Sequence, residues 1–344
     1  MRAIVNDIWF GDGAPERAGR AVLWLPEQAF AAGVAVRNHW FDRAVGRGHV
    51  GPIPAISVGN ITVGGTGKTP VAAWVAGELA RRGARPAIVL RGYGGDEPAV
   101  HARLNPDVPV VVDVDRVHGV RRAAALNADV AILDDAFQHR RAARIVDLVL
   151  VSAERGLDRA RLLPAGPFRE PVSALRRATL VVVTRKTAAL ERAAAVLNAA
   201  TASSGQGGAV VSLQPESLVA VEGGETRPLS ALRGCRVMLM TGVGEPALVA
   251  SQLQAAGASV ELRAFPDHHA FTDRELARAG RAAAAADYAV CTLKDAVKIS
   301  TRWPGSGALW YVSQQVTVER GLERLEAALD RVIAAIPLNP STAG

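Results

Sequence analysis

The sequence predicts an α/β fold with two domains. Three observations carry this prediction: strand-like and helix-like segments alternate for most of the 344 residues, glycine-rich loops follow the first two strand-like runs, and 49% of the residues are hydrophobic. The chain is too long for one typical domain and long enough to bury two hydrophobic cores.

The first predicted domain covers residues 48–215. We expect a parallel sheet with helices on both faces, because buried-strand runs alternate here with helical segments. The expected strands are 53–58, 86–90, 109–112, 130–133, 146–151 and 180–183, and the expected helices are 69–82 and 116–127.

The alternation of strand-like and helix-like segments restarts after an extended stretch at 212–221. This predicts a second, smaller α/β domain over residues 216–318. Its expected strands are 235–240, 259–264, 288–292 and 309–312, and its expected helices are 246–256 and 273–286. A final amphipathic helix is expected at 319–336, and residues 319–344 are assigned to this helix and a tail.

Residues 1–47 are predicted to form a membrane-associated helical segment. Residues 21–36 are the most apolar early stretch, but they are too short to span a bilayer comfortably and contain Pro26 and Glu27. A basic flank with Trp40 follows, a pattern typical of helices that lie in the membrane interface. The alternative is a helix packed on the protein's own core.

The net charge of +7 favours an anionic partner. Arginine carries nearly all of it, because the chain has lysine only at positions 68, 186, 294 and 298. A lysine that persists in such a composition is a functional candidate, since a guanidinium cannot replace a compact ammonium.

The strongest motif is SVGNITVGGTGKTP, residues 57–70. A strand leads into a glycine-rich turn that opens a helix with Gly-Lys-Thr, the pattern of a P-loop, whose backbone amides surround phosphate oxygens. Lys68 can reach the β- and γ-phosphates and Thr69 can bind Mg²⁺. Thr62 stands where the usual pattern has its first glycine.

Carboxylates follow two of the predicted strands. Asp134 and Asp135 end the run VAILDD, which fits a Walker-B strand that holds Mg²⁺. Asp96 and Glu97 lie in the loop after the second strand, where a carboxylate can orient a hydroxyl and take its proton. A solvated acidic loop is the alternative for this second pair.

The segment FPDHHAF, residues 265–271, places two histidines beside Asp267. One short cluster of this kind makes a poor metal site. The more specific functional interpretation is a histidine that pairs with a carboxylate from elsewhere in the chain. A structural histidine at a strand end is the alternative.

Together these motifs resemble the tetraacyldisaccharide 4'-kinases. The matching segments run in family order through VGNITVGGTGKTP, RGYGG, GDEP, DDAFQHR, LLPAGPFRE, TGVGEP, FPDHH and TLKDAVK, from about residue 17 to about residue 313. Ala136 departs from the glycine that is usual after the acidic pair, and the stretch between RGYGG and GDEP is nearly absent.

The resemblance implies an ATP-dependent kinase that phosphorylates the 4'-hydroxyl of a lipid A precursor. It implies a P-loop NTPase-like domain, a second α/β domain, the cofactors ATP and Mg²⁺, and a location at the cytoplasmic face of the bacterial inner membrane. Its partners are the lipid-linked disaccharide and the membrane surface, with no nucleic acid and no obligate protein partner expected.

The family motifs also assign the candidate site residues. The catalytic pair is Asp96 with a histidine of the DH motif, for which we favour His268 over His269. The other assignments are a nucleotide site of Gly64, Gly65, Thr66, Gly67, Lys68 and Thr69; metal ligands Thr69, Asp134 and Asp135; and substrate contacts Tyr93, Glu97, Arg169 and Glu170.

Two other functions remain open from sequence. A regulatory P-loop NTPase or metallochaperone would need a guanine-specifying loop, and Thr292–Asp295 (TLKD) superficially fits, although it lies in the second domain. A nucleic-acid-binding ATPase would fit the basic charge, but aromatic residues make up only 5% of the chain and no basic–aromatic stacking motif is present.

Overall fold

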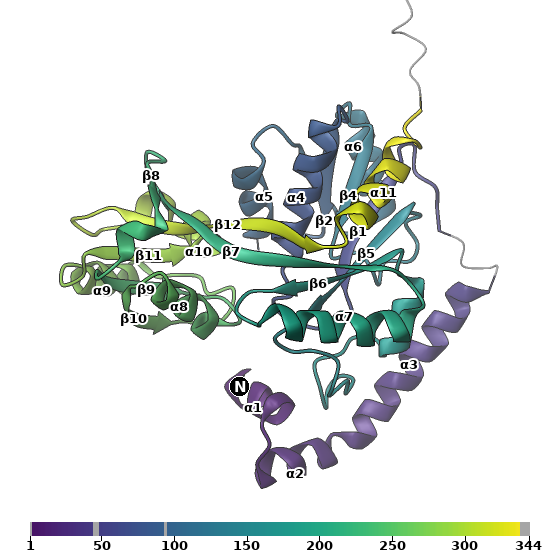
Figure 1. Ribbon diagram of the computed structural model, residues 1–344, viewed down its shortest axis with the longest axis horizontal. Helices are drawn as coiled ribbons and strands as arrows, with labels where there is room; N and C mark the ends of the chain where they lie inside the picture. Colours follow the sequence, from purple (N-terminus) through teal and green to yellow (C-terminus); the bar gives the residue numbers. More distant parts are fainter. Residues whose placement is uncertain (1, 44–47, 93–94, 338–344) are drawn as a thin grey trace, which may run out of the picture. The chain divides into compact units, whose positions relative to one another are not determined.

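The computed structural model describes residues 2–43, 48–92 and 95–337 (Figure 1). The chain divides into two compact units. Unit 1 comprises residues 1–91, 105–211 and 318–344, and unit 2 comprises residues 92–104 and 212–317. Residues 92–104 therefore belong to unit 2, although unit 1 precedes and follows them in the sequence.

Unit 1 is built on a largely parallel sheet with the strand order β7-β6-β5-β1-β4-β2-β3. Every residue of its central strands β1, β2 and β4 is buried, as expected for parallel strands covered on both faces. The strand bounds are β1 Ala55–Asn60, β2 Pro86–Leu90, β3 Val110–Val112, β4 Val130–Asp134, β5 Val146–Ser152, β6 Leu180–Arg185 and β7 Gly208–Ala220.

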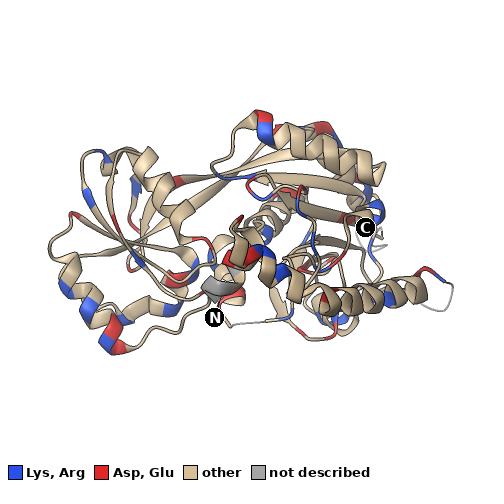
Figure 2. Cartoon of the chain, turned by 90° about the horizontal axis from the view of Figure 1, so that it is seen from below, with Lys and Arg blue, Asp and Glu red and all other residues tan. Residues whose placement is uncertain are grey.

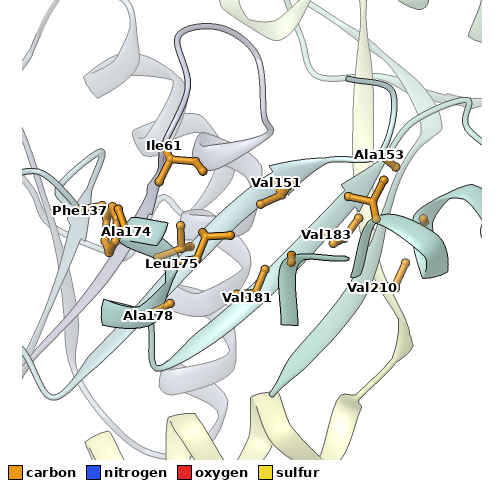
Figure 3. Packing of buried hydrophobic residues seen from close by; sticks show 14 of the residues in the cluster. Ile61, Phe137, Val151, Ala153, Ala174, Leu175, Ala178, Val181, Val183 and Val210 are labelled. Carbon is orange, nitrogen blue, oxygen red and sulfur yellow. The ribbon is translucent and has the colours of Figure 1, made fainter. Parts of the chain in front are cut away.

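Helices cover this sheet and close its core. Helix α4 (Lys68–Arg81) packs on β1, β2 and β4, and α11 (Leu322–Ile333) packs on β5 and β6. Helix α6 (Arg116–Ala125) packs on β2, β3 and β4. The 3₁₀ helix η2 (Val172–Arg177) and α7 (Leu190–Ser204) bury an apolar cluster against β5 and β6 (Figure 3).

Three helices precede the sheet: α1 (Arg2–Phe10), α2 (Ala14–Val22) and α3 (Trp24–Asp42). The apolar stretch expected as one helix is interrupted at Leu23, where α2 ends and α3 begins. Polar contacts join α3 to the rest of unit 1. The buried Glu27 carboxylate accepts hydrogen bonds from the Arg161 guanidinium and the Leu162 amide.

Unit 2 is built on strands in the order β10-β9-β11-β12-β7, and β8 pairs antiparallel with β7. Two apolar clusters form its core. Its strands are β8 Thr226–Pro228, β9 Arg236–Thr241, β10 Ser259–Ala264, β11 Tyr288–Thr292 and β12 Leu309–Arg320; its helices are α5 Glu97–Leu104, η3 Leu229–Leu232, α8 Pro246–Ala255, α9 Asp273–Ala283, α10 Leu293–Ile299 and η4 Ser300–Arg302.

The structure confirms the predicted α/β class and corrects two expected elements. The last helix was predicted to start at residue 319, but β12 continues to Arg320 and α11 begins at Leu322. Gly321 makes the turn in the left-handed region with φ 73°, and a Cβ there would lie 2.5 Å from the Gly208 carbonyl oxygen. Glu97, expected in a loop, is the first residue of α5.

Candidate active site

The glycine-rich turn of unit 1 connects the end of β1 to the start of α4. Gly64 and Gly67 adopt φ values of 107° and 82°, which side chains other than glycine rarely tolerate. A Cβ on Gly64 would also lie 2.6 Å from the Arg155 guanidinium. These two glycines bring Lys68 to the first position of α4 and bury Thr69 in its first turn.

Side-chain hydrogen bonds hold this turn in one conformation. Asn60 Nδ2 donates to Thr66 Oγ1 at 2.7 Å, and Thr184 Oγ1 donates to the Thr66 carbonyl at 2.9 Å. Lys186, in the loop after β6, donates to the Gly65 carbonyl at 2.9 Å. A turn fixed in this way is preorganised for a ligand, which lowers the entropic cost of binding.

The acidic pair lies beside this turn because β4 pairs with β1 in parallel, with Asp134 opposite Val58. Asp135 follows with φ 51°, and its carboxylate lies 3.7 Å from Lys68 Nζ and 3.1 Å from an Arg169 guanidinium nitrogen. Burial alone would raise the pKa of Asp135, but the charges of Lys68 and Arg169 lower it below its ordinary value. Asp135 is therefore ionised at neutral pH.

The four predicted substrate residues have different placements. Tyr93 lies outside the described residues, and Glu97 begins α5 in unit 2. Arg169 pairs with Asp135 through both carboxylate oxygens. Glu170 is fully buried and pairs with Arg37 of α3 and Arg177 of η2, which makes it a link between the N-terminal helices and the core of unit 1.

The second group of candidate residues lies within unit 2. Asp96 directly precedes α5, and its side chain is 1% exposed. His268 Nδ1 lies 3.1 Å and 3.2 Å from the two Asp96 carboxylate oxygens. The structure thus brings these two residues together across 172 positions of sequence.

Backbone geometry distinguishes the two adjacent histidines. His268 has φ 60°, a strained conformation for a residue with a side chain, and its amide donates to the Gly242 carbonyl at 3.0 Å. His269 instead places Nε2 3.0 Å from Glu275 Oε2 and packs its ring against Phe265 and Phe271. His269 is thereby engaged in the packing of unit 2, whereas His268 faces Asp96.

The two sites provide complementary chemistry. The glycine-rich turn, Lys68 and the helix N-terminus suit the binding of a polyphosphate. A buried carboxylate held by a histidine suits the removal of a proton from a hydroxyl group. A chain with both groups of residues has the parts that phosphoryl transfer to an alcohol requires.

Comparison with known proteins identifies the family. The family model described as tetraacyldisaccharide-1-P 4'-kinase matches residues 19–96 and 94–334. The tetraacyldisaccharide 4'-kinase of Anaeromyxobacter sp. (strain Fw109-5) is 40% identical over 369 residues, covering 96% of this chain and 97% of that protein. The chain belongs to the tetraacyldisaccharide-1-P 4'-kinase family.

Other tetraacyldisaccharide 4'-kinases agree with this assignment. That of Geobacter sulfurreducens is 36% identical, covering 93% of this chain and 96% of that protein. The crystal structure of LpxK from Aquifex aeolicus in complex with ATP matches with a TM-score of 0.72 at 27% identity, covering 91% of this chain and 99% of that one. The resemblance predicted from the motifs and the P-loop kinase-like fold are thereby confirmed.

In this member of the kinase family, the TLKD segment caps a helix. Thr292 is the N-cap of α10, and its hydroxyl donates to Asp295 Oδ2 at 2.6 Å. Asp295 is fully buried, so its carboxylate lies inside unit 2. Sequence reasoning considered Asp295 only as part of a guanine-specifying loop and Lys298 only as one of four scarce lysines, and it did not predict the contact of Lys298 with Asp96. The scarcity of lysine in the chain was the available signal for Lys298.

Proposed function

We propose that this protein transfers the γ-phosphoryl group of ATP to the 4'-hydroxyl of a tetraacyldisaccharide 1-phosphate, a precursor of lipid A. The observation that carries the proposal is the buried Asp96–His268 pair in a chain that also has a P-loop. The P-loop stabilises the negative charge of the phosphates, but it provides no base to take the proton of the acceptor hydroxyl. Asp96 supplies that base.

The nucleotide is assigned to unit 1. Gly64, Gly65, Thr66 and Gly67 form the turn that surrounds the phosphates, and Lys68 contacts the β- and γ-phosphates. The ion pairs of Lys68 and Arg169 with Asp135 keep both cations at the edge of the sheet where the phosphates are expected. The relative from Aquifex aeolicus was crystallised with ATP.

The residues beside the turn also fit Mg²⁺. Thr69 contributes a hydroxyl, and Asp134 and Asp135 contribute carboxylates, which are the oxygen ligands that Mg²⁺ prefers. The parallel pairing of β1 with β4 brings these groups to the same sheet edge. When bound, Mg²⁺ neutralises charge on the β- and γ-phosphates. Among the chain's own residues, Lys68 adds a positive charge at the same place.

The acceptor hydroxyl is assigned to unit 2. Asp96 accepts the proton of this hydroxyl, and His268 orients the Asp96 carboxylate through its contacts with both oxygens. Tyr93 and Glu97 flank Asp96 in sequence and are proposed to contact the disaccharide. Arg169 is proposed to contact the substrate from unit 1, and Glu170 supports it by holding the adjacent segment against α3.

The lipid part of the substrate is assigned to the N-terminal helices. Trp24 and Leu25 are 55% and 69% exposed, and Val36 and Trp40 on the same helix are also exposed. In the part of the chain that the structure describes, no helix has both the length and the apolarity to cross a bilayer. We therefore propose peripheral binding to the cytoplasmic face of the inner membrane, with α3 held to unit 1 by Glu27 and Asn38.

One transfer experiment tests the proposal. The purified protein is incubated with γ-labelled ATP or GTP, with and without tetraacyldisaccharide 1-phosphate in detergent micelles. We expect label in the lipid only with ATP and acceptor together. The proposal would be overturned in favour of a regulatory NTPase if nucleotide hydrolysis did not depend on the acceptor lipid, or if the protein preferred GTP to ATP.

The nucleic-acid alternative is tested in the same assay. The described Lys and Arg residues are scattered over both units with acidic residues among them (Figure 2). This distribution differs from the basic stripe by which a protein follows a phosphate backbone. Turnover that rises with added DNA or RNA and not with the lipid would overturn the kinase assignment.

A further inference from the structure

A second side chain, that of Lys298, contacts the Asp96 carboxylate besides His268. Lys298 lies on α10, and its Nζ atom is 3.7 Å from Asp96 Oδ2 and 3.5 Å from Asp295 Oδ1. The Lys298 side chain is mostly buried, and its Nζ atom lies 5.7 Å from the centre of the Phe271 ring. Two carboxylates and an aromatic face therefore enclose this ammonium.

Asp295 is the fixed partner of Lys298. It accepts hydrogen bonds from the Thr241 hydroxyl at 2.8 Å, the Thr292 hydroxyl at 2.6 Å and the Gly242 amide at 3.0 Å. These donors stabilise the Asp295 charge independently of Lys298. Because residues three positions apart lie on the same face of a helix, Asp295 holds the Lys298 ammonium where it meets Asp96.

These contacts form a closed ring around the catalytic pair. The Gly242 amide donates to Asp295, and the Gly242 carbonyl accepts from the amide of His268. His268 contacts Asp96, Asp96 contacts Lys298, and Lys298 contacts Asp295. A Cβ on Gly242 would lie 3.0 Å from the Pro266 carbonyl oxygen, so the close approach of the segment that carries His268 favours a glycine at this position.

The charges in this ring make the ammonium important. Asp96 and Asp295 are two buried carboxylates, and Lys298 is the cation that lies between them. A nearby positive charge favours the ionised form of a carboxylate, and a nearby negative charge disfavours it. Without Lys298, the Asp96 and Asp295 carboxylates would lose the cation that lies between them.

Composition points to the same residue. Four of the 40 basic residues of the chain are lysine, and one of them is at position 298. A compact ammonium can meet carboxylates on two sides, whereas the planar guanidinium is wider and has fixed donor directions. In a chain that uses arginine almost everywhere, a lysine here indicates that this geometry matters.

We infer that Lys298 is a positioning residue for the phosphoryl transfer, which holds the Asp96 carboxylate oriented toward the acceptor hydroxyl. The inference rests on the proposed function, since it acts through Asp96. In this role Lys298 touches neither ATP nor the disaccharide. Its contribution is therefore to kcat, and the KM for ATP depends on unit 1.

The test compares variants of the full-length enzyme in the lipid transfer assay. We expect Lys298→Met to lower kcat by about 10²-fold and to leave the KM for ATP unchanged. Misplacement of a catalytic group by about 1 Å typically lowers the rate by about this factor. Lys298→Arg keeps the charge and should recover part of the lost kcat. If the methionine variant does not fold, Lys298→Gln gives the same comparison.

Two controls separate positioning from general stability. Lys294 lies on the same helix and makes no ion pair within the described part of the chain, so Lys294→Met should retain wild-type kcat. In an Asp96→Asn background, Lys298→Met should cost no further activity. Thermal melts of every variant establish that the assays report folded protein.

Three outcomes contradict the inference: a wild-type kcat in Lys298→Met, equal losses in the methionine and arginine variants, or a full additional loss in the Asp96→Asn background. The proposed function fails in a different way. A silent Asp96→Asn variant contradicts the role of Asp96 itself, whereas a damaging Asp96→Asn with a silent Lys298→Met contradicts the positioning role alone.

Discussion

Asp96 and His268 are predicted to act as one catalytic unit, so their substitutions should not multiply. His268 Nδ1 faces both oxygens of the Asp96 carboxylate, and that carboxylate is nearly inaccessible to water. If the carboxylate takes the proton and the imidazole holds the carboxylate, each residue is ineffective without the other. Asp96→Asn and His268→Ala should then each lower kcat.

The size of the effect follows from the geometry. His268 Nδ1 lies 3.1 Å from Asp96 Oδ1; a hydrogen bond to a charged group contributes about 1.5–3 kcal/mol, and leaving a buried charged group without its partner costs about 3 kcal/mol or more. The His268 side chain is 29% exposed, so solvent reduces these values, and we expect a coupling of about 2–4 kcal/mol, or about 30- to 1,000-fold in rate. Loss of general base catalysis itself typically costs about 10²–10⁴-fold.

The assay is a double-mutant cycle on kcat, with labelled phosphate transferred to tetraacyldisaccharide 1-phosphate at saturating ATP. We expect about a 10³-fold loss in each single variant and a similar loss in the double variant. Independent action would instead give a loss near the product, about 10⁶-fold. His269→Ala is the matched control. Multiplicative losses, or a His269→Ala variant as impaired as His268→Ala, would refute the reasoning.

Three further predictions concern other parts of the molecule. Lys68→Ala and Thr69→Ala should each lower kcat by about 10²–10³-fold in the transfer assay, because each removes one interaction with developing charge, and near-normal turnover in Lys68→Ala would exclude the P-loop assignment. Replacing the exposed Trp24 and Leu25 by serine should reduce flotation with anionic liposomes without lowering the melting temperature, and the remaining binding should weaken with salt; equal flotation would place the helix on the protein's own core. The Thr272 amide, the His269 imidazole and the Thr272 hydroxyl lower the pKa of Glu275 from 4.5 to about 2, so this carboxylate stabilises the fold above pH 4.5 and the benefit is lost as the pH falls toward 2. Thermal melts should show Glu275→Gln less stable than wild type at pH 7, with a difference that shrinks below pH 4.5; a difference independent of pH would contradict this assignment.

The proposed nucleotide site could be predicted from the sequence because its residues are consecutive. The turn and the helix that carry Lys68 and Thr69 follow β1 directly, and the glycines that this turn requires can be read from the sequence. Asp134 and Asp135 were found because a run of buried apolar residues ends at them. Parallel pairing of β1 with β4 then fixes their position beside the turn, which is a general property of such sheets.

The other parts of the molecule depend on contacts that local patterns do not encode. The pairing of Arg169 with Asp135, the burial of Glu170 against α3 and the contact of Lys298 with Asp96 each join segments that are distant in sequence. The choice between His268 and His269 likewise depends on one strained backbone angle. The end of β12 was missed because residues 319–336 continue an amphipathic pattern, and only Gly321 signalled the break.

Assignment of residues 92–104 to unit 2 has a consequence for catalysis. Asp96 lies in this short segment, between two stretches of unit 1 sequence, yet His268 and Lys298, which it contacts, belong to unit 2. The carboxylate proposed as the base therefore belongs to the same unit as both of these partners. In the proposed function, unit 1 residues bind ATP and unit 2 residues prepare the acceptor hydroxyl. Substitutions in the ring around Asp96 should for this reason change kcat while leaving the affinity for ATP intact, and substitutions in the P-loop should change both.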